Sequence, residues 1–381
     1  MNNERIPELD ALRGVAAFTV LLNHCFAVYP GIYGVLSSKS IAGAGFLLSV
    51  FSFSPLHIFW NGRAAVILFF VLSGFVLSIS HYNGLKFYYG SYLIKRICRL
   101  YIPYFIIITI SVFLLNYYQG SHETEQISYQ FNRSWNTKIN ICDYIYLLLL
   151  HGKVDIVNFP LWTVIIEIEI AIILPFCIML IKRLNFYSNM IFIVAYLIIL
   201  KLAAHTISNL DIIARNLYYL PFFLFGSLLY KHRMKFRNLR VTNAFYIVTT
   251  YVVISILCNW EWLIVWFVKY DKDNFLFFIN DYMIAIGSIL LIIICISNFG
   301  SIKKVLNKAA FQFLGRISYS LYLIHVVVIL FVLYYFRFTN YKYQVLTVIT
   351  SCLLVSYGYY LCIERPSIKL GKYLASRFRG K

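Results

Sequence analysis

Two ionisable side chains, Arg13 and His24, stand eleven residues apart in the first apolar run of the chain, LDALRGVAAFTVLLNHCF. At 100° per residue, eleven residues take an α-helix about 20° past three full turns, so both side chains lie on one face, about 16 Å apart along the axis. Asp10 lies one turn before Arg13 on the same side. A histidine titrates near neutral pH, so His24 is a candidate general base.

A charged side chain at the centre of a bilayer costs roughly 2.5–3.5 kcal/mol on insertion scales, which favours a functional role for these residues. The structural alternative for Arg13 is that it reaches the membrane surface and pairs with Asp10. The structural alternative for His24 is a hydrogen bond that only holds two helices together.

Two acids, Glu167 and Glu169, lie in a later apolar run, LWTVIIEIEIAIILP. They are about 200° apart on a helix, so they cannot both face one pocket. Glu167 lies about 10 Å from the outer end of its helix, a depth similar to that of His24. We therefore expect Glu167 to orient or charge-pair His24, with an unrelated helix–helix contact as the alternative.

Arg96 and Arg99 precede the third apolar run, one helical turn apart, and share a face. Two arginines on one face suit a phosphate group, which guanidinium groups grip in bidentate fashion. The alternative is that they only mark the cytoplasmic side of the membrane, an interpretation that suffices for Lys95.

The remaining polar candidates lie in other apolar runs. Ser318, Tyr322 and His325 are spaced to form a stripe on one helix face, which is as consistent with a structural role as with a catalytic one. We interpret Ser73, next to Gly74 in FFVLSGFVLS, as a small packing residue. Glu364 is an unusual acid among basic residues at the end of the last apolar run.

The elements that must position these residues are membrane helices. The 381 residues are 61% hydrophobic and 13% charged, with a mean hydropathy of +0.74, whereas soluble domains carry about 25% charged residues. Apolar runs near 20 residues predict an all-α polytopic bundle of about ten spans. They cover about 9–29, 63–81, 100–118, 160–181, 187–205, 216–230, 243–260, 279–298, 317–336 and 344–363.

The distribution of charge orients these spans. With a cytoplasmic N-terminus, most of the 34 lysines and arginines fall in loops on the cytoplasmic side, and both termini are cytoplasmic. A further span at 41–60 would reverse this bias, so we interpret that segment as interfacial or re-entrant. The net charge of +19 is spread over many loops, which argues against a nucleic-acid-binding face.

Six motifs in order resemble the acyltransferase 3 family of integral-membrane O-acyltransferases. The start LDALRG with His24 is similar to the family's LDGLRG and histidine. FFVLSGFVLS and KRICRLYIPYF follow, and LWTVIIEIEIAIILP is similar to a family LWSLSVEEQFYLLLP. GRISYSLYLIH and IERP complete the resemblance, which runs from Leu9 to Pro366.

This resemblance implies transfer of an acyl group, usually acetyl, from cytosolic acyl-CoA to a hydroxyl of a surface polysaccharide or lipid-linked glycan. The family's catalytic arginine and histidine fall on Arg13 and His24, and its acid falls on Glu167. Its arginine pair falls on Arg96 and Arg99, so acyl-CoA phosphates would bind there and near Arg13. Acetyl-CoA is then a co-substrate, and no metal is expected.

This chain departs from the family pattern after Glu167. The family's second acid would fall on Ile168, its glutamine on Glu169 and its aromatic pair on Ile170 and Ala171. These departures place the role of this span in question.

The predicted organisation is an acyltransferase 3-like membrane domain, 1–366, and a basic cytoplasmic tail, 367–381, without the esterase-like domain of some family members. The resemblance implies a multi-pass protein of a bacterial plasma membrane, whose partners are acyl-CoA, a glycan acceptor and lipids. The main alternative is a flippase of lipid-linked sugars. A membrane glycosyltransferase would need an acidic outer-loop site, for which Asp143 and Asp155 are the only hints.

Overall fold

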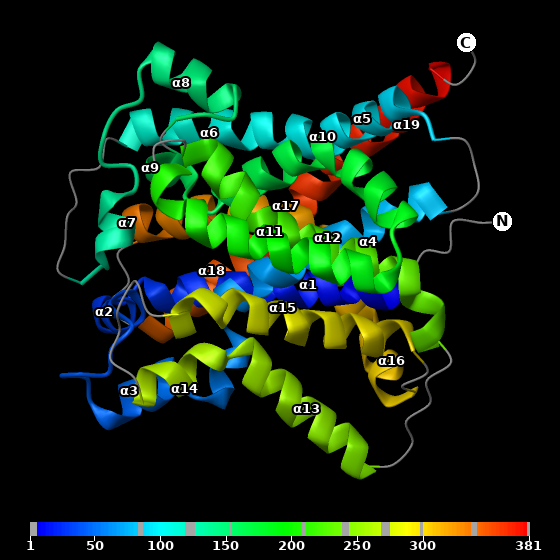
Figure 1. The fold of residues 1–381 in the computed structure, drawn as a ribbon. Coiled ribbons are helices and arrows are strands. Elements are labelled where there is room, and N and C mark those ends of the chain that lie inside the picture. The colour runs from blue at the N-terminus through cyan, green and yellow to red at the C-terminus, as the bar shows by residue number, and fades with distance from the viewer. Residues whose placement is uncertain are drawn as a thin grey trace.

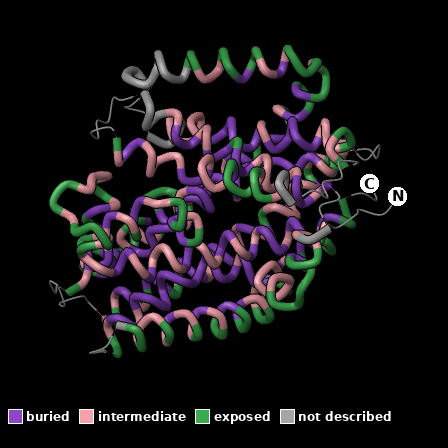
Figure 2. The backbone as a smooth tube through the Cα atoms, turned by 90° about the horizontal axis from the view of Figure 1, so that it is seen from below, coloured by how far each residue is buried: buried purple, intermediate pink, exposed green. Residues whose placement is uncertain are grey.

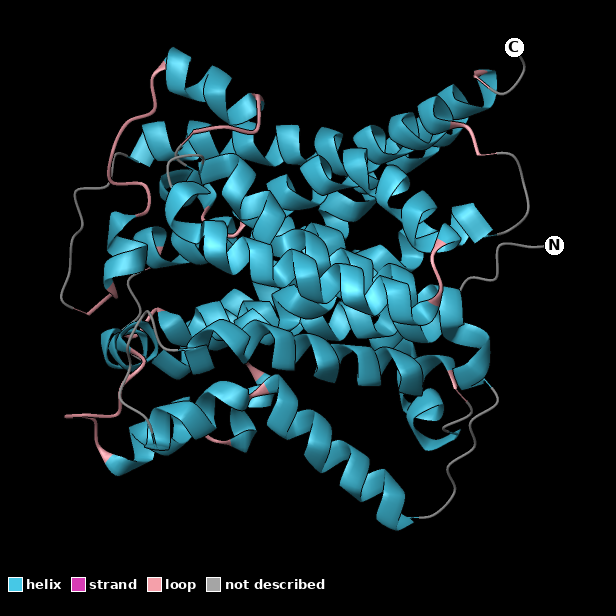
Figure 3. Cartoon of the chain, viewed as in Figure 1, coloured by secondary structure: helices cyan, strands magenta, loops and turns pink. Residues whose placement is uncertain are grey.

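The computed structural model describes residues 6–82, 87–118, 126–152, 154–207, 211–237, 244–267, 275–297, 300–336 and 341–378. Within these ranges every regular element is a helix and no strand occurs (Figure 3). The predicted all-α fold class is therefore confirmed.

The helices are arranged as Figure 1 shows. In chain order they are α1 (Pro7–Ala27), α2 (Pro30–Ser38), α3 (Phe46–Ser52), η1 (Pro55–Phe59), α4 (Gly62–Tyr82), α5 (Tyr89–Arg96), η2 (Ile97–Tyr101), α6 (Ile102–Tyr118), α7 (Tyr129–Arg133), α8 (Ile141–Leu148), α9 (Val154–Asn158), α10 (Leu161–Arg183), α11 (Phe186–Ile207), α12 (Asp211–Arg237), α13 (Ala244–Cys258), α14 (Trp260–Phe267), α15 (Phe275–Ile296), α16 (Gly300–Leu306), α17 (Ala309–Tyr335), α18 (Tyr341–Tyr359), η3 (Tyr360–Glu364) and α19 (Arg365–Arg377).

The predicted count of ten spans is not confirmed, although each predicted span coincides with a helix. Six described helices are long and apolar enough to cross a membrane, or eight if two bent pairs each count as one span. The pairs are α1 with α2, bent by 111°, and α13 with α14, bent by 61°. Pro30 is the first residue of α2, directly after the bend, a position at which the missing N–H of proline has no cost. The protein is an integral membrane protein.

The segment 41–60 forms no spanning helix. It contains α3, of seven residues, and the 3-10 helix η1, of five. At 1.5 Å per residue α3 is about 10 Å long, whereas a bilayer core is about 30 Å thick. The segment 141–150 likewise forms only α8, of eight residues.

Connecting segments gather at two opposite ends of the bundle (Figure 1). One end holds the start of α1 with α5, α16 and α19, and we call it the α5 end. The other holds α2, α3, α7, α8 and α14, and we call it the α8 end. The charge pattern predicts that the first group is cytoplasmic and the second is outside, and the two groups lie at opposite ends of the bundle.

Two glycine contacts bring the central helices together. A Cβ on Gly74 of α4 would lie 2.0 Å from the carbonyl oxygen of Phe223 in α12. A Cβ on Gly14 of α1 would lie 2.3 Å from the backbone nitrogen of Gly315 in α17. Only glycine lets these backbones approach so closely, as small residues commonly do between membrane helices.

Helix α17 lies at the centre of the bundle. In its most apolar window 83% of the residues are buried, against 22% for the α18–α19 segment. Figure 2 shows the buried residues following the middle helices and the exposed residues following the outer ones. Side chains on the inner faces of the central helices are therefore shielded from the surroundings.

Helix α19 crosses the predicted domain boundary at residue 366. It packs on α5 and η2, where a Cβ on Gly371 would lie 2.8 Å from the Cβ of Cys98. The described part of the predicted tail is thus a packed helix of the α5 end.

We expect Gly74→Ala to destabilise the bundle, because the added methyl group must push α4 away from the α12 backbone. Overpacking of this kind costs about 1–3 kcal/mol. The thermal unfolding midpoint of the purified protein in detergent should fall by several degrees. The control is Gly358→Ala in α18, where a Cβ would meet no atom within 4 Å. Equal stability of the two variants would contradict the close crossing.

Candidate active site

A pocket with about 680 Å³ of empty space, open solvent included, lies where α1, α4, α10 and α17 meet the α5–η2 segment. Charged and hydroxyl-bearing side chains share its wall with apolar ones. Its lining consists of Arg13, Val66, Phe69, Phe70, Ser73, Val76, Leu77, Arg96, Arg99, Leu100, Thr163, Val164, Glu167, Ser318, Tyr319 and Tyr322. The structure therefore brings together seven of the predicted candidate residues from segments that are distant in sequence: Arg13, Ser73, Arg96, Arg99, Glu167, Ser318 and Tyr322.

The three arginines reach the pocket from two directions. Arg13 projects from α1, and its guanidinium lies 3.8 Å from the carboxylate of Asp10 one turn earlier. Arg96 ends α5, and Arg99 lies in the π-helical turn η2 that interrupts the long helix 89–118. Turns of this kind are frequent at functional sites because they shift side chains around the helix axis.

Arg96 and Arg99 form no ion pair with any described residue. The guanidinium of Arg96 lies 5.9 Å from the centre of the Tyr92 ring. Both arginines line the pocket, as their shared helix face predicts. Their hydrogen-bond donors are therefore available to an anion in the pocket.

Glu167 and Glu169 face different neighbours, as their spacing on α10 predicts. The Ser73 hydroxyl of α4 donates a hydrogen bond to Glu167 Oε1 at 2.8 Å. Glu169 instead accepts hydrogen bonds from Asn216 at 2.8 Å and from Arg215 at 3.3 Å, both in α12. Ser73, interpreted from sequence as a packing residue, thus also holds the one acid of α10 that lines the pocket.

Glu364 lies near the arginines without lining the pocket. It is 4% exposed in the π-helical turn η3 and accepts a hydrogen bond from Ser320 at 2.5 Å. Asp10, Glu167 and Glu364 are the carboxylates close enough to act on the charge of Arg13. The arginine cluster is therefore balanced in part by acids that hydroxyl groups or Arg13 hold in place.

Tyr322 lines the pocket on the side nearer the α8 end. Its hydroxyl accepts a hydrogen bond from Thr163 at 2.6 Å and donates one to the carbonyl oxygen of Pro160 at 3.3 Å. Its ring meets the Phe69 ring edge-on, with centroids 5.5 Å apart. These contacts join α17, α10 and α4 at one level of the bundle.

His24 and His325 form a stacked pair one turn beyond Tyr322. Their ring centroids lie 5.2 Å apart and their planes are inclined by 23°. The Phe159 ring meets His24 edge-on at 5.0 Å, and the Tyr322 ring lies 5.6 Å from His325. In the predicted polar stripe of α17, Ser318 and Tyr322 line the pocket, while His325 contacts His24.

The expected pairing of Glu167 with His24 must be corrected, since no hydrogen bond or ion pair joins them in the described chain. Phe159, which contacts His24, comes just before α10. Glu167 lies six residues after Leu161, the first residue of that helix, which is about 9 Å along its axis. The expectation assumed that α10 begins at the membrane surface. Helix α10 begins at the level of His24 instead. Asn158, just before it, is buried and donates a hydrogen bond to the carbonyl oxygen of Leu323 in α17, two residues before His325.

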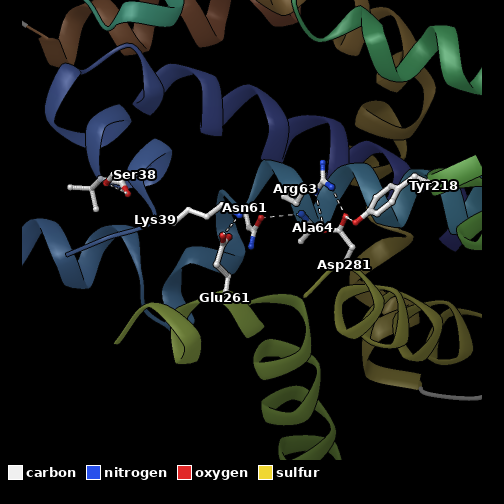
Figure 4. Close-up of polar contacts among 9 residues, drawn as sticks. Ser38, Lys39, Asn61, Arg63, Ala64, Tyr218, Glu261 and Asp281 are labelled. Carbon is white, nitrogen blue, oxygen red and sulfur yellow. Dashed lines mark hydrogen bonds and ion pairs between the residues drawn. The ribbon is translucent and has the colours of Figure 1, made fainter. Parts of the chain in front are cut away.

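A second charged network, which the sequence motifs did not indicate, lies near the α8 end. Figure 4 shows Arg63 of α4, Asp281 of α15 and Tyr218 of α12 pointing toward one another. Arg63 forms an ion pair with Asp281 and donates from Nε at 2.9 Å, while Tyr218 donates to the same carboxylate at 2.8 Å. Tyr219 accepts a hydrogen bond from Arg63 at 3.0 Å. Two opposite charges in separate apolar runs were the signal that could have indicated this pair.

Further polar links tie the same region together. Asn61 donates a hydrogen bond to Asn259 Oδ1 at 2.8 Å. Lys39 forms an ion pair with Glu261 at 2.7 Å (Figure 4). Because these groups satisfy one another, we interpret them as structural.

The arrangement separates two kinds of chemistry along the bundle axis. Toward the α5 end it offers guanidinium groups that can bind an anion, and toward the α8 end it offers two imidazoles that can accept protons. The described residues contain no group of three or more histidine, cysteine or acidic side chains that could hold a metal ion.

The comparisons with known proteins assign the family. The curated proteins and the solved structures with which the chain was compared gave no match. The acyltransferase domain that defines the acyltransferase 3 family matches residues 6–363, a range that contains the whole pocket and both histidines. This chain therefore belongs to the acyltransferase 3 family.

Proposed function

We propose that this protein is an acyl-CoA-dependent O-acyltransferase of a bacterial plasma membrane. It moves an acetyl or other short acyl group from cytosolic acyl-CoA to a hydroxyl of an extracytoplasmic surface polysaccharide or lipid-linked glycan. The observation that carries the proposal is a three-arginine pocket together with a histidine pair further along α1 and α17, two of the helices that line the pocket. Family membership favours acyl transfer over the transporter alternative.

The donor side of the proposal rests on the arginines. Coenzyme A carries several phosphate groups on a long, narrow pantetheine chain. Arg96 and Arg99 offer guanidinium donors that no described carboxylate occupies, and Arg13 lies on the same pocket wall. Phosphates would bind toward the α5 end, so that the thioester extends toward the histidines.

The acceptor side of the proposal rests on His24. Its imidazole would take the proton of the acceptor hydroxyl while the hydroxyl oxygen attacks the thioester carbonyl. The carbon–sulfur bond then breaks, and the CoA thiolate leaves and takes the proton from the imidazolium. The alternative course passes through an acyl group carried covalently on His24. Both courses need His24, and in both Glu167 balances the charge of the pocket arginines.

We expect His24→Ala to abolish acyl transfer, because a positioned general base contributes about 10²–10⁴-fold to rate. Base-releasable acetate on surface glycans should fall at least about a hundredfold below the wild-type level at matched membrane abundance. His81→Ala, which alters a histidine outside the pocket and the histidine pair, should leave acetate unchanged. Equal acetate in the wild type and His24→Ala would remove His24 from the mechanism. Wild-type glycans that carry no acetate or longer acyl group would contradict the proposed function.

We expect Arg96→Ala and Arg99→Ala each to weaken binding of coenzyme A. A hydrogen bond to a charged group contributes about 1.5–3 kcal/mol, so the dissociation constant should rise about tenfold or more. Isothermal titration calorimetry on the purified protein in nanodiscs measures this directly. The matched control is Arg377→Ala, an exposed arginine of α19 at the same end of the bundle. The donor assignment is wrong if both pocket variants bind coenzyme A as tightly as the control.

A further inference from the structure

His325 carries a buried hydrogen-bond acceptor without a donor. Its Nδ1 lies 3.1 Å from the carbonyl oxygen of Leu321, one turn earlier in α17. A carbonyl only accepts, so Nδ1 must carry the proton, and Nε2 of the neutral ring is then a lone pair. The side chain is 1% exposed, and Nε2 has no hydrogen-bond partner among the described residues. Buried polar atoms are normally paired, so this atom points to a missing donor.

The neighbours of His325 cannot supply that donor. His24 stacks on the face of the ring, so the two rings form no hydrogen bond with each other. The Tyr322 hydroxyl is engaged by Thr163 and Pro160. The Asn158 amide donates to the carbonyl oxygen of Leu323, and the Cys352 thiol lies 3.7 Å from the carbonyl oxygen of His325 itself. None of these described neighbours supplies the donor, so a bound water or a substrate molecule must.

We infer that Nε2 of His325 accepts a hydrogen bond from the glycan acceptor, an inference that rests on the proposed function. A hydroxyl group has one hydrogen, and His24 takes the hydrogen of the reacting hydroxyl. His325 must then bind a second hydroxyl of the same acceptor. The stacked pair thus selects an acceptor that presents two neighbouring hydroxyls, as a sugar ring does, and disfavours a simple alcohol.

Two substitutions separate the lone pair from the shape of the ring. His325→Gln keeps an oxygen acceptor on a side chain of similar reach but loses the aromatic ring. His325→Phe keeps a flat ring that can stack on His24 but has no acceptor. If the Nε2 lone pair binds a hydroxyl of the glycan, the Gln variant retains more acyl-transfer activity than the Phe variant. If His325 only stacks on His24, the Phe variant retains more.

The test measures base-releasable acyl groups on the surface glycans of cells that make each variant at matched membrane abundance. Coenzyme A affinity of each purified protein is measured in parallel. We expect His325→Phe to lower glycan acylation about tenfold, because one hydrogen bond to the glycan is lost. Its coenzyme A affinity should stay within about twofold of the wild type, because the arginine pocket is intact. His325→Gln should keep several-fold more acylation than His325→Phe.

Each other outcome overturns the inference. Acylation by His325→Phe at or above that of His325→Gln would show that His325 only stacks. A parallel fall in coenzyme A affinity would show a general structural role. If wild-type glycans carry no acyl group, the proposed function itself fails. If both variants acylate glycans normally, only the role of His325 in binding the glycan is ruled out.

Discussion

The backbone contact between α1 and α17 sets the geometry on which the candidate site depends. Both helices run from the α5 end to the α8 end (Figure 1). Gly14 meets the backbone of Gly315 at their contact. His24 and His325 each stand ten residues further along their own helix. Two parallel helices rise equally per residue, so a contact at the glycines places the two imidazoles at one level. Arg13, the neighbour of Gly14, is placed on the pocket wall by the same contact.

Burial of charge in a membrane explains which polar residues are structural. A charge that leaves water must be paired or hydrogen-bonded, because its desolvation is otherwise too costly. Arg63 satisfies this rule with Asp281, and Arg215 satisfies it with Glu169. Arg96 and Arg99 have no such partner in the described structure, and both line the pocket. Missing partners therefore distinguish the pair that is available to a ligand from the pairs that join helices.

The departures from the family pattern on α10 lie outside the pocket. Among the residues of that helix only Thr163, Val164 and Glu167 line it. Glu169, where the family has glutamine, binds α12, and Tyr92 donates a hydrogen bond to the carbonyl oxygen of Ala171. These departures therefore affect the packing of α10 against its neighbours more than the lining of the pocket.

Local periodicity allowed much of the helical structure to be predicted from sequence. The positions of the helices, the shared face of Arg96 and Arg99, and the opposite directions of Glu167 and Glu169 all follow from 3.6 residues per turn. The order of the motifs indicated the family. Each of these properties depends on residues within a few turns of one another, so the amino-acid sequence by itself determined them.

Contacts between distant helices decided the rest. Four features belong to this group: the 111° bend after α1, the level at which α10 begins, the Arg63–Asp281 pair and the stacking of His24 on His325. The two stacked histidines are 301 residues apart in the sequence. Depth in a membrane cannot be counted from the start of an apolar run when a buried turn, such as the one at Phe159, precedes the helix. Only the tertiary structure could show that Glu167 belongs with the arginines and His24 with His325, because the packing of helices against one another, not their periodicity, determines relative height.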